Sequence, residues 1–142
     1  MITIREQIRI DAPLSEVFDY MNQPGNQPEI TPSLVRSETL ETLDNGGKRA
    51  RYTYRLFGLR FEGEVRGIEH EPPERIVFEM TGDIEGRIEW TFEPATRGTR
   101  VTYAAAYDLG LPAALEPILG PIADRFNRRE LERTLETLRA RL

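Results

Sequence analysis

Residues 111–142 read LPAALEPILGPIADRFNRRELERTLETLRARL, and this stretch decides the fold. It is long enough for a major helix, which at 1.5 Å per residue would measure roughly 45 Å. Almost everything between residue 33 and this helix alternates as β-strands do. A long helix that follows so many strands is expected to lie across the concave face of their sheet. There it either closes a solid core or covers a ligand cavity, and that choice decides the function.

The predicted strands alternate apolar and polar residues and are separated by short turns. The turn signals include Asp44-Asn45-Gly46-Gly47, Gly82-Asp83 and Arg97-Gly98. Consecutive strands joined in this way form an antiparallel meander. We expect the first strand at an edge of the sheet or beside the last strand. The predicted strand ranges are 3–10, 33–43, 48–57, 59–68, 76–81, 84–92 and 101–107.

Two short helices are predicted after the first strand. Pro13 suits the first position of a helix, where its missing N–H costs nothing. The apolar residues that follow it at helical spacing are Leu14, Val17, Phe18 and Met21. Several prolines and a glycine then leave room for a single helical turn near residues 26–30.

The predicted sheet has one aromatic and aliphatic face and one face made of Arg and Glu. We expect the charged face, with Arg51 and Glu89, to lie in water. The apolar face must be covered, and the helices after Pro13 and Pro112 are the covers that the chain offers. The sequence therefore predicts a single α+β domain over residues 1–142. In it, a curved antiparallel sheet of about seven strands wraps around a long C-terminal helix.

Composition excludes several kinds of chemistry. The chain has no cysteine, so disulfides, thiolate nucleophiles and cysteine zinc sites are excluded. His70 is its one histidine, expected in an exposed turn, and Lys48 is its one lysine, so Schiff-base chemistry would have to use Lys48. The net charge of −5 gives no general attraction to nucleic acid. We expect no cofactor, no metal, no membrane span and no signal peptide, and a soluble cytoplasmic location.

The long helix carries two apolar stripes that do not align. The first consists of Leu115, Ile118, Leu119, Ile122 and Phe126, and the second of Leu131, Leu135, Leu138 and Leu142. The five-residue step from Phe126 to Leu131 turns the second stripe by about 140° or more. A π-bulge near residues 127–130 or a break at Gly120-Pro121 would explain this step. A gradual change in the direction of the apolar face, as the helix follows a curved sheet, would also explain it. So would burial of one stripe against a partner chain, and a homodimer therefore stays open.

The order of these elements resembles a known superfamily. The sharpest local marks are Ile10-Asp11-Ala12-Pro13 and Val17-Phe18-Asp19-Tyr20, supported by Pro28-Glu29-Ile30 and Glu71-Pro72-Pro73-Glu74-Arg75. Together with the meander and the terminal helix, they resemble the START-like, helix-grip superfamily, which includes polyketide cyclase/dehydrase-like proteins and proteins like the G-type subunit of carbon-monoxide dehydrogenase. The resemblance implies a cavity under the long helix that binds lipids, sterols or polyketides. It implies no particular catalytic residue.

The candidate ligand-binding residues lie on the predicted inner face of the sheet and on the first half of the long helix. They are Tyr52, Tyr54, Phe61, Trp90, Tyr103, Leu115, Ile118 and Ile122. For any single aromatic residue, ordinary core packing is the stronger interpretation, but several tyrosines together indicate a wetter interior than a plain core needs. We expect Leu131, Leu135 and Leu138 to be buried against the sheet. We expect the Pro- and Gly-rich first half of the helix to lie at the mouth of a cavity.

These expectations favour binding of a small, largely apolar molecule between the helix and the sheet. A cavity of about 300–1,000 Å³ would suit a drug-sized ligand. One alternative is a cyclase or dehydratase that moves protons through tyrosines or a buried carboxylate. Another is a non-enzymatic module that assists a larger complex. A filled core with an exposed apolar helix face would favour the module.

Overall fold

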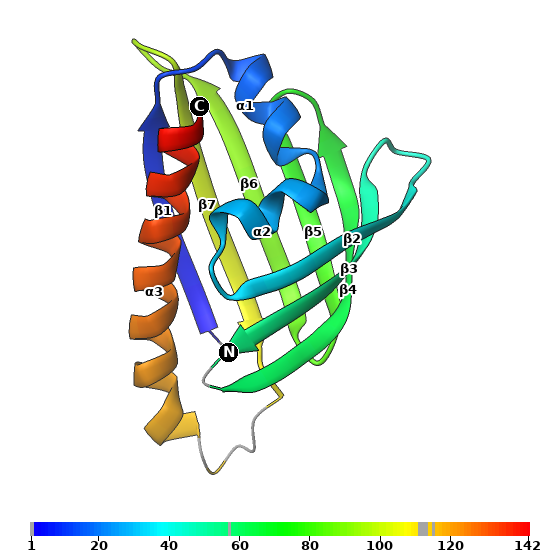
Figure 1. Cartoon of the computed structure of the whole chain (residues 1–142), viewed down its shortest axis with the longest axis vertical. Coiled ribbons are helices and arrows are strands. Elements are labelled where there is room, and N and C mark those ends of the chain that lie inside the picture. Colours follow the sequence, from blue (N-terminus) through cyan, green and yellow to red (C-terminus); the bar gives the residue numbers. More distant parts are fainter. Residues whose placement is uncertain (1, 57, 111–113, 115) are drawn as a thin grey trace.

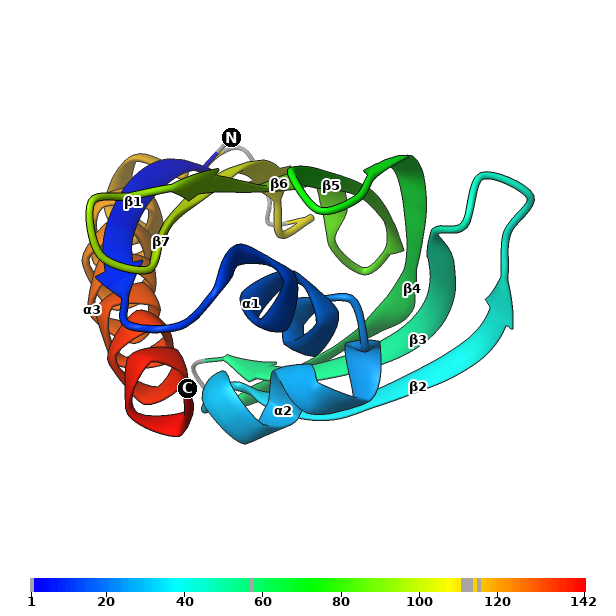
Figure 2. The same cartoon turned by 90° about the horizontal axis from the view of Figure 1, so that it is seen from above.

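The computed structural model describes residues 2–56, 58–110, 114 and 116–142. In these residues, seven antiparallel strands form one sheet in the order β1-β7-β6-β5-β4-β3-β2. The sheet curves strongly, so that its two halves face each other (Figure 2). The strands are β1 (Ile2–Ile10), β2 (Leu34–Thr42), β3 (Lys48–Leu56), β4 (Leu59–Glu71), β5 (Arg75–Gly82), β6 (Glu85–Pro94) and β7 (Thr99–Asp108).

The predicted meander is confirmed, because each strand from β2 to β7 pairs with the next along the chain. The first strand joins the last, since β1 pairs with β7 over its whole length. This pairing brings the N-terminal segment beside the strand that precedes the terminal helix. The long helix packs against β1, the strand from the opposite end of the chain.

The helices cover the concave side of the sheet. They are α1 (Leu14–Met21), the 3-10 turn η1 (Pro24–Asn26), α2 (Gln27–Ile30) and α3 (Glu116–Arg141). Figure 1 shows α1 and α2 over the middle of the sheet and α3 running beside β1. Helix α3 contacts β1 and α2, while α1 contacts β6. The predicted helix-grip architecture is confirmed in both its sheet and its helices.

The inward side chains of the strands form the core with the buried face of α1. Val17, Phe18 and Met21 of α1 are buried, as the helical spacing predicted. Phe18 meets Phe92 of β6 edge to face, with ring centroids 5.5 Å apart. Such a pair adds a specific geometry to the area that both rings bury. Helix α1 is thereby fixed against one end of the sheet.

The outer face of the sheet is the predicted lattice of arginine and glutamate. Arg49 of β3 pairs with Glu41 and Glu64 on its two neighbouring strands, at 3.1 and 2.9 Å. Arg75 of β5 pairs in the same way with Glu69 and Glu89, at 2.9 and 2.8 Å. Solvent-exposed pairs of this kind add little stability each. They keep this face hydrated and leave the concave face for the core and the site.

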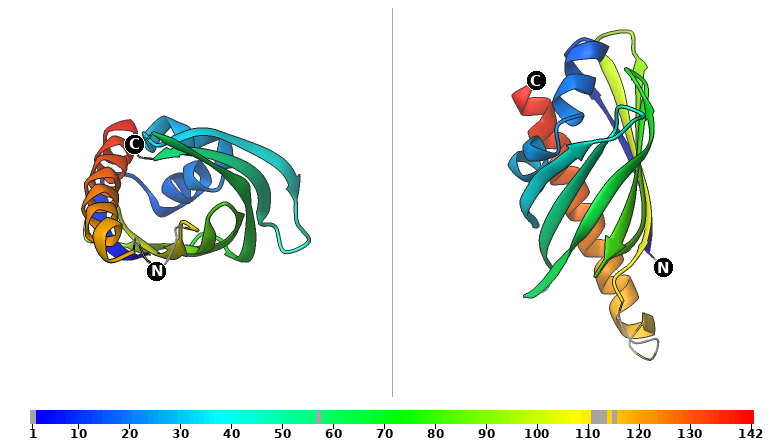
Figure 3. Two further views of the ribbon diagram at one scale, coloured as in Figure 1. Left: turned by 90° about the horizontal axis from the view of Figure 1, so that it is seen from below. Right: turned by 90° about the vertical axis from the view of Figure 1, so that its right-hand side faces the viewer.

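The two stripes of α3 have different surroundings. Leu131, Leu135 and Leu138 are buried, as predicted. Ile118 and Ile122 are 66% and 54% exposed, since the first turns of α3 extend beyond the end of the sheet (Figure 3). The helix runs unbroken from Glu116 to Arg141 through Pro121, with neither the break nor the π-bulge considered above. The stripes diverge because only the second half of α3 has the sheet beneath it.

Candidate functional site

A cavity lies between α3, the chain around α2 and the inner face of the sheet. Its volume is about 100 Å³. Among the described residues, its apolar lining consists of Ile4, Leu56, Met80, Ile84, Ile88, Trp90, Tyr107 and Leu131. Its polar lining consists of Gln27, Thr31, Ser33, Tyr54, Tyr103, Glu130 and Thr134. An apolar wall with a few convergent polar groups is the usual build of a small-molecule site.

Two aromatic residues form one wall of this cavity. Trp90 of β6 and Tyr103 of β7 are direct cross-strand partners. Their ring centroids are 4.8 Å apart in an edge-to-face arrangement. Side chains alternate across a strand, so the period of two along β6 and β7 turns both rings to the concave side. The wall therefore presents two rigid rings, one of which carries a hydroxyl group.

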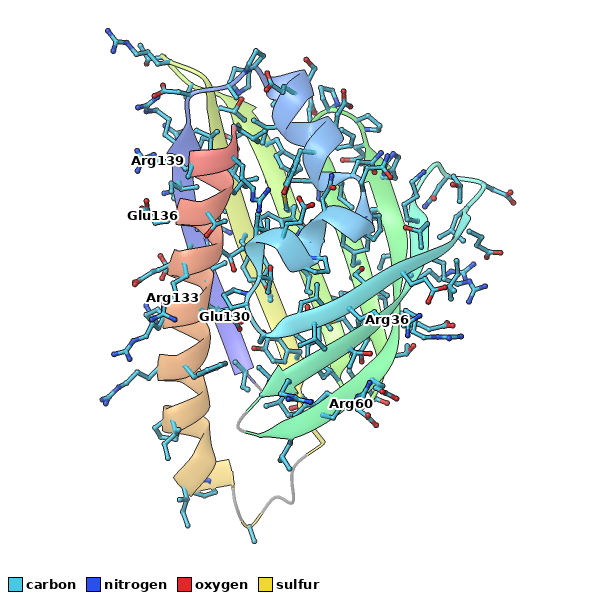
Figure 4. The ribbon with its side chains drawn as sticks, in the orientation of Figure 1. Arg36, Arg60, Glu130, Arg133, Glu136 and Arg139 are labelled. Atoms are coloured by element: carbon cyan, nitrogen blue, oxygen red, sulfur yellow. The ribbon has the colours of Figure 1, made fainter. Side chains whose placement is uncertain are left out.

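The polar end of the cavity joins α3 to the start of β2. The Ser33 backbone N–H donates a hydrogen bond to the Glu130 carboxylate. Ser33 is 5% exposed, and its Oγ has no hydrogen-bond partner among the described residues. Thr134 lies one helical turn after Glu130, so the two side chains share a face of α3. Figure 4 shows Glu130 on the side of α3 toward the sheet, whereas Arg133 and Glu136 lie on the outer side.

Two of the three tyrosines of the lining, Tyr54 and Tyr103, remain protonated far above neutral pH. Burial raises the pKa of Tyr54, and the nearby Tyr103, Glu130 and Tyr52 raise it further. Burial also raises the pKa of Tyr103, with smaller contributions from Tyr107 and Glu130. Both phenol groups are therefore neutral in the site and can donate and accept hydrogen bonds.

Comparison with known protein families identifies the family to which this chain belongs. The sequence model of the family described as "Polyketide cyclase / dehydrase and lipid transport" matches residues 1–142. The chain belongs to this family. No curated protein matches it significantly.

Solved structures resemble this polyketide cyclase/dehydrase-like chain closely in fold. A protein from Thermus thermophilus superimposes with a TM-score of 0.86 at 20% identity, over 98% of this chain and 95% of the other. A START superfamily protein from Mycobacterium smegmatis gives 0.74 at 13% identity, over 98% and 95% of the two chains. The di-domain ARO/CYC StfQ of the steffimycin biosynthetic pathway gives 0.74 at 16% identity, over 98% of this chain and 50% of StfQ. At these low sequence identities, the structural similarity shows only that these proteins share the fold of this chain.

Six of the eight predicted ligand-binding residues of this family member fall into three groups. Tyr54, Trp90 and Tyr103 line the cavity. Tyr52 and Phe61 are buried in the core beside it. Leu115 lies outside the described residues.

Ile118 and Ile122, the other two predicted residues, lie on the surface of α3. Ile122 borders a second, shallower hollow on α3, of about 340 Å³, together with Pro121, Arg125, Phe126 and Arg129. For all eight residues, contact with a ligand stays a prediction.

Tyr52 has a structural role that the sequence did not reveal. Its hydroxyl donates to the backbone carbonyl of Thr81 at 2.9 Å and accepts from the Ile84 backbone N–H at 3.1 Å. A Cβ at Gly63 would clash with that hydroxyl and with the Thr81 carbonyl, so glycine is required there. Tyr52 thus ties β3 to the turn between β5 and β6.

His70 does not lie in an exposed turn, and that prediction is wrong. It belongs to β4, opposite the buried Ile76, and its ring centroid is 5.7 Å from that of Phe18. Its Nδ1 is buried without a hydrogen-bond partner among the described residues. Burial, with a smaller contribution from Lys48, lowers the pKa of His70 below its ordinary value. The cause is that β4 extends to Glu71, beyond the predicted end of the strand at residue 68. A register shift between Gly67 and Glu69 also changes the side of the sheet that later residues face.

Sequence reasoning missed the polar end of the cavity. Glu130 and Thr134 precede Leu138 by eight and four residues, so helical spacing alone places them beside the buried stripe. Ser33 carried no such signal, because it directly precedes a strand whose pairing had to be known first. Glu130 and Ser33 are 97 residues apart in the chain, and only the fold brings them together.

Two other kinds of site were sought in the part of the chain that the structure describes. No group of three or more His, Asp or Glu side chains there could hold a metal ion. None of its helices combines the length and the apolar character that crossing a bilayer requires.

Proposed function

We propose that this chain binds a small, largely apolar molecule in the cavity between α3 and the sheet. The observation that carries the proposal is the division of the lining into an apolar wall and a polar end, at Ser33, Glu130 and Thr134. A purely structural core gains nothing from a buried hydroxyl that lacks a partner. Such a hydroxyl is useful where a ligand supplies the missing hydrogen bond. The lipid transport named in the family description is in keeping with this function.

The size of the cavity restricts the ligand. Its volume of about 100 Å³ is smaller than the range expected from the sequence. Met80, Trp90 and Leu131 account for part of the difference, because their large side chains occupy the space under α3. We therefore expect a compact ligand, or a longer one that enters as α3 and α2 move apart. Either ligand would contact Trp90, which lines the cavity.

A titration with octan-1-ol tests this proposal. Trp90 is the one tryptophan of the chain, and it lines the cavity, so its emission reports on occupancy. We expect a saturable change in emission and a rise in melting temperature, because a ligand that binds the folded state stabilises it. Calorimetry should give a negative heat-capacity change as apolar surface is buried. Unchanged emission and melting temperature up to the solubility limit would remove the support for this function.

A second candidate function is a cyclase or dehydratase reaction. The observation that favours it is the presence of two neutral phenols and a carboxylate, Tyr54, Tyr103 and Glu130, in the lining of one cavity. Such groups can transfer protons to and from a bound carbonyl compound. Incubation with a linear aromatic polyketide precursor, followed by mass spectrometry, tests this reaction. Loss of water or ring closure that Tyr103→Phe slows would support it, and an unchanged precursor would leave binding as the function.

A further inference from the structure

The polar end of the cavity carries a negative charge without a positive one. Glu130 is the one charged side chain among the described lining residues, and none of them is Lys or Arg. A cavity that receives a fatty acid or another carboxylate needs a cation or several donors for its head group. Here the head group of a ligand would meet a carboxylate.

The donors and acceptors at this end suit a particular kind of head group. The Ser33 N–H occupies one oxygen of Glu130, and the other oxygen can accept a hydrogen bond from a ligand. The unpartnered Ser33 Oγ and the Thr134 hydroxyl can donate or accept. A group that donates to Glu130 and also accepts from a hydroxyl would satisfy this end. An alcohol or phenol does both, and an ammonium group donates only.

A carboxylate head group has the opposite properties. It offers acceptors alone, so it cannot donate to Glu130. Its charge would also lie close to a like charge in a cavity that is partly shielded from water, where repulsion is stronger than in bulk water. Because the lining residues that the structure describes include no cation to offset this repulsion, a carboxylate would both lack the hydrogen bond to Glu130 and be repelled by it.

We infer that the cavity selects apolar molecules with a hydrogen-bond-donating head group, a hydroxyl or an ammonium, and rejects carboxylates, with Glu130 as the residue that determines this specificity. The inference rests on the proposed function, because it names the ligand class of the same cavity. It goes further by separating sterol-like alcohols, phenols and amines from fatty acids. The separation follows from the charge and geometry at Ser33, Glu130 and Thr134.

Three probes with eight carbon atoms each test the inference. Octan-1-ol, octylammonium and octanoate differ in their head groups, and the alkyl chain of octanoate is one methylene shorter because its eighth carbon belongs to the carboxylate. At about neutral pH octanoate is ionised and octylamine is protonated, as for other carboxyl and amino groups. Binding is followed by Trp90 emission and by calorimetry. We expect octan-1-ol and octylammonium to bind, and octanoate to bind at least about tenfold more weakly than octan-1-ol.

Two variants of α3 separate the charge of Glu130 from general effects. Glu130→Gln keeps an oxygen for the Ser33 N–H and removes the charge. It should improve octanoate binding by about tenfold and weaken octylammonium. It should weaken octan-1-ol less than octylammonium, because the alcohol can accept a hydrogen bond from the new amide NH2. Glu136→Gln is the matched control, because Glu136 is on the outer side of the same helix and 66% of its side chain is exposed. It should leave the affinities of all three probes unchanged.

The outcomes distinguish this inference from the proposed function. Octanoate that binds the wild-type chain as tightly as octan-1-ol would overturn the inference and leave the cavity as a binding site. So would a Glu130→Gln variant that ranks the three probes as the wild type does. If none of the probes binds the wild type, the proposed function fails and the inference fails with it. Selectively weak octanoate binding, restored by Glu130→Gln alone, supports both.

Discussion

Leu135→Ala tests whether the second half of α3 holds the domain together. Leu135 is 4% exposed and lies in the stripe that α3 turns toward the core. The substitution removes about three methyl-sized groups, worth roughly 0.8 kcal/mol each in transfer free energy. The space left behind adds a cavity term, and measured Leu→Ala changes in cores span about 2–5 kcal/mol. We expect a loss of unfolding free energy within this range.

The matched variant is Ile122→Ala, on the stripe of the same helix that extends beyond the sheet. Ile122 is 54% exposed, so its truncation should change the unfolding free energy by no more than about 0.5 kcal/mol. Urea unfolding followed by circular dichroism measures both variants, and an unchanged slope shows that the unfolded states are comparable. A similar loss at both positions would refute the division of α3 into a packed half and an exposed half.

Three further predictions concern the cavity and its surroundings. Ser33→Ala should weaken octan-1-ol binding by about 0.5–1.5 kcal/mol in calorimetry without lowering the melting temperature, because Ser33 Oγ has no hydrogen-bond partner among the described residues. A melting temperature lowered with no change in affinity would contradict this. If Ile122 lies at the cavity mouth, Ile122→Ser should slow octan-1-ol association in stopped-flow measurements. Val35→Ser, at an equally exposed position on β2, should not slow it. Equal association rates in the two variants would exclude a mouth at Ile122. The pKa of His70 is lowered by burial, so the unfolded chain binds the proton more tightly than the folded one. Urea unfolding at a series of pH values should therefore show stability that is complete above about pH 6.5 and falls as the pH drops toward the lowered pKa. His70→Gln should lose this part of the pH dependence, and an identical profile in both proteins would contradict the burial of His70.

The fold could be predicted because its signals are local. Alternation along each strand and glycine turns such as Gly82-Asp83 specify a meander without knowledge of any distant contact. The apolar face then has to be covered, and the long helix after Pro112 is the main cover available. Leu131, Leu135 and Leu138 are buried for this reason.

The site could be predicted only in part because its polar end is not local. Trp90 and Tyr103 were identified since alternation turns both to the concave side. Helical spacing places Glu130 beside the buried stripe, but only the fold brings Ser33 to it and so forms the polar end. His70 was misplaced because one register shift in β4 reverses the alternation beyond Gly67. Side-chain packing sets the cavity volume, and no sequence period reports it.

A crystal of the protein soaked with 8-bromooctan-1-ol tests the central claim most directly, because anomalous scattering locates the bromine and the electron density locates the hydroxyl. We predict bromine in the apolar part of the cavity, near Ile88 and Trp90, and the hydroxyl oxygen within hydrogen-bond distance of Glu130 or Ser33. Bromine found only on the exposed surface of α3 near Ile118 and Ile122, or the reverse orientation with bromine at Glu130, would contradict the account.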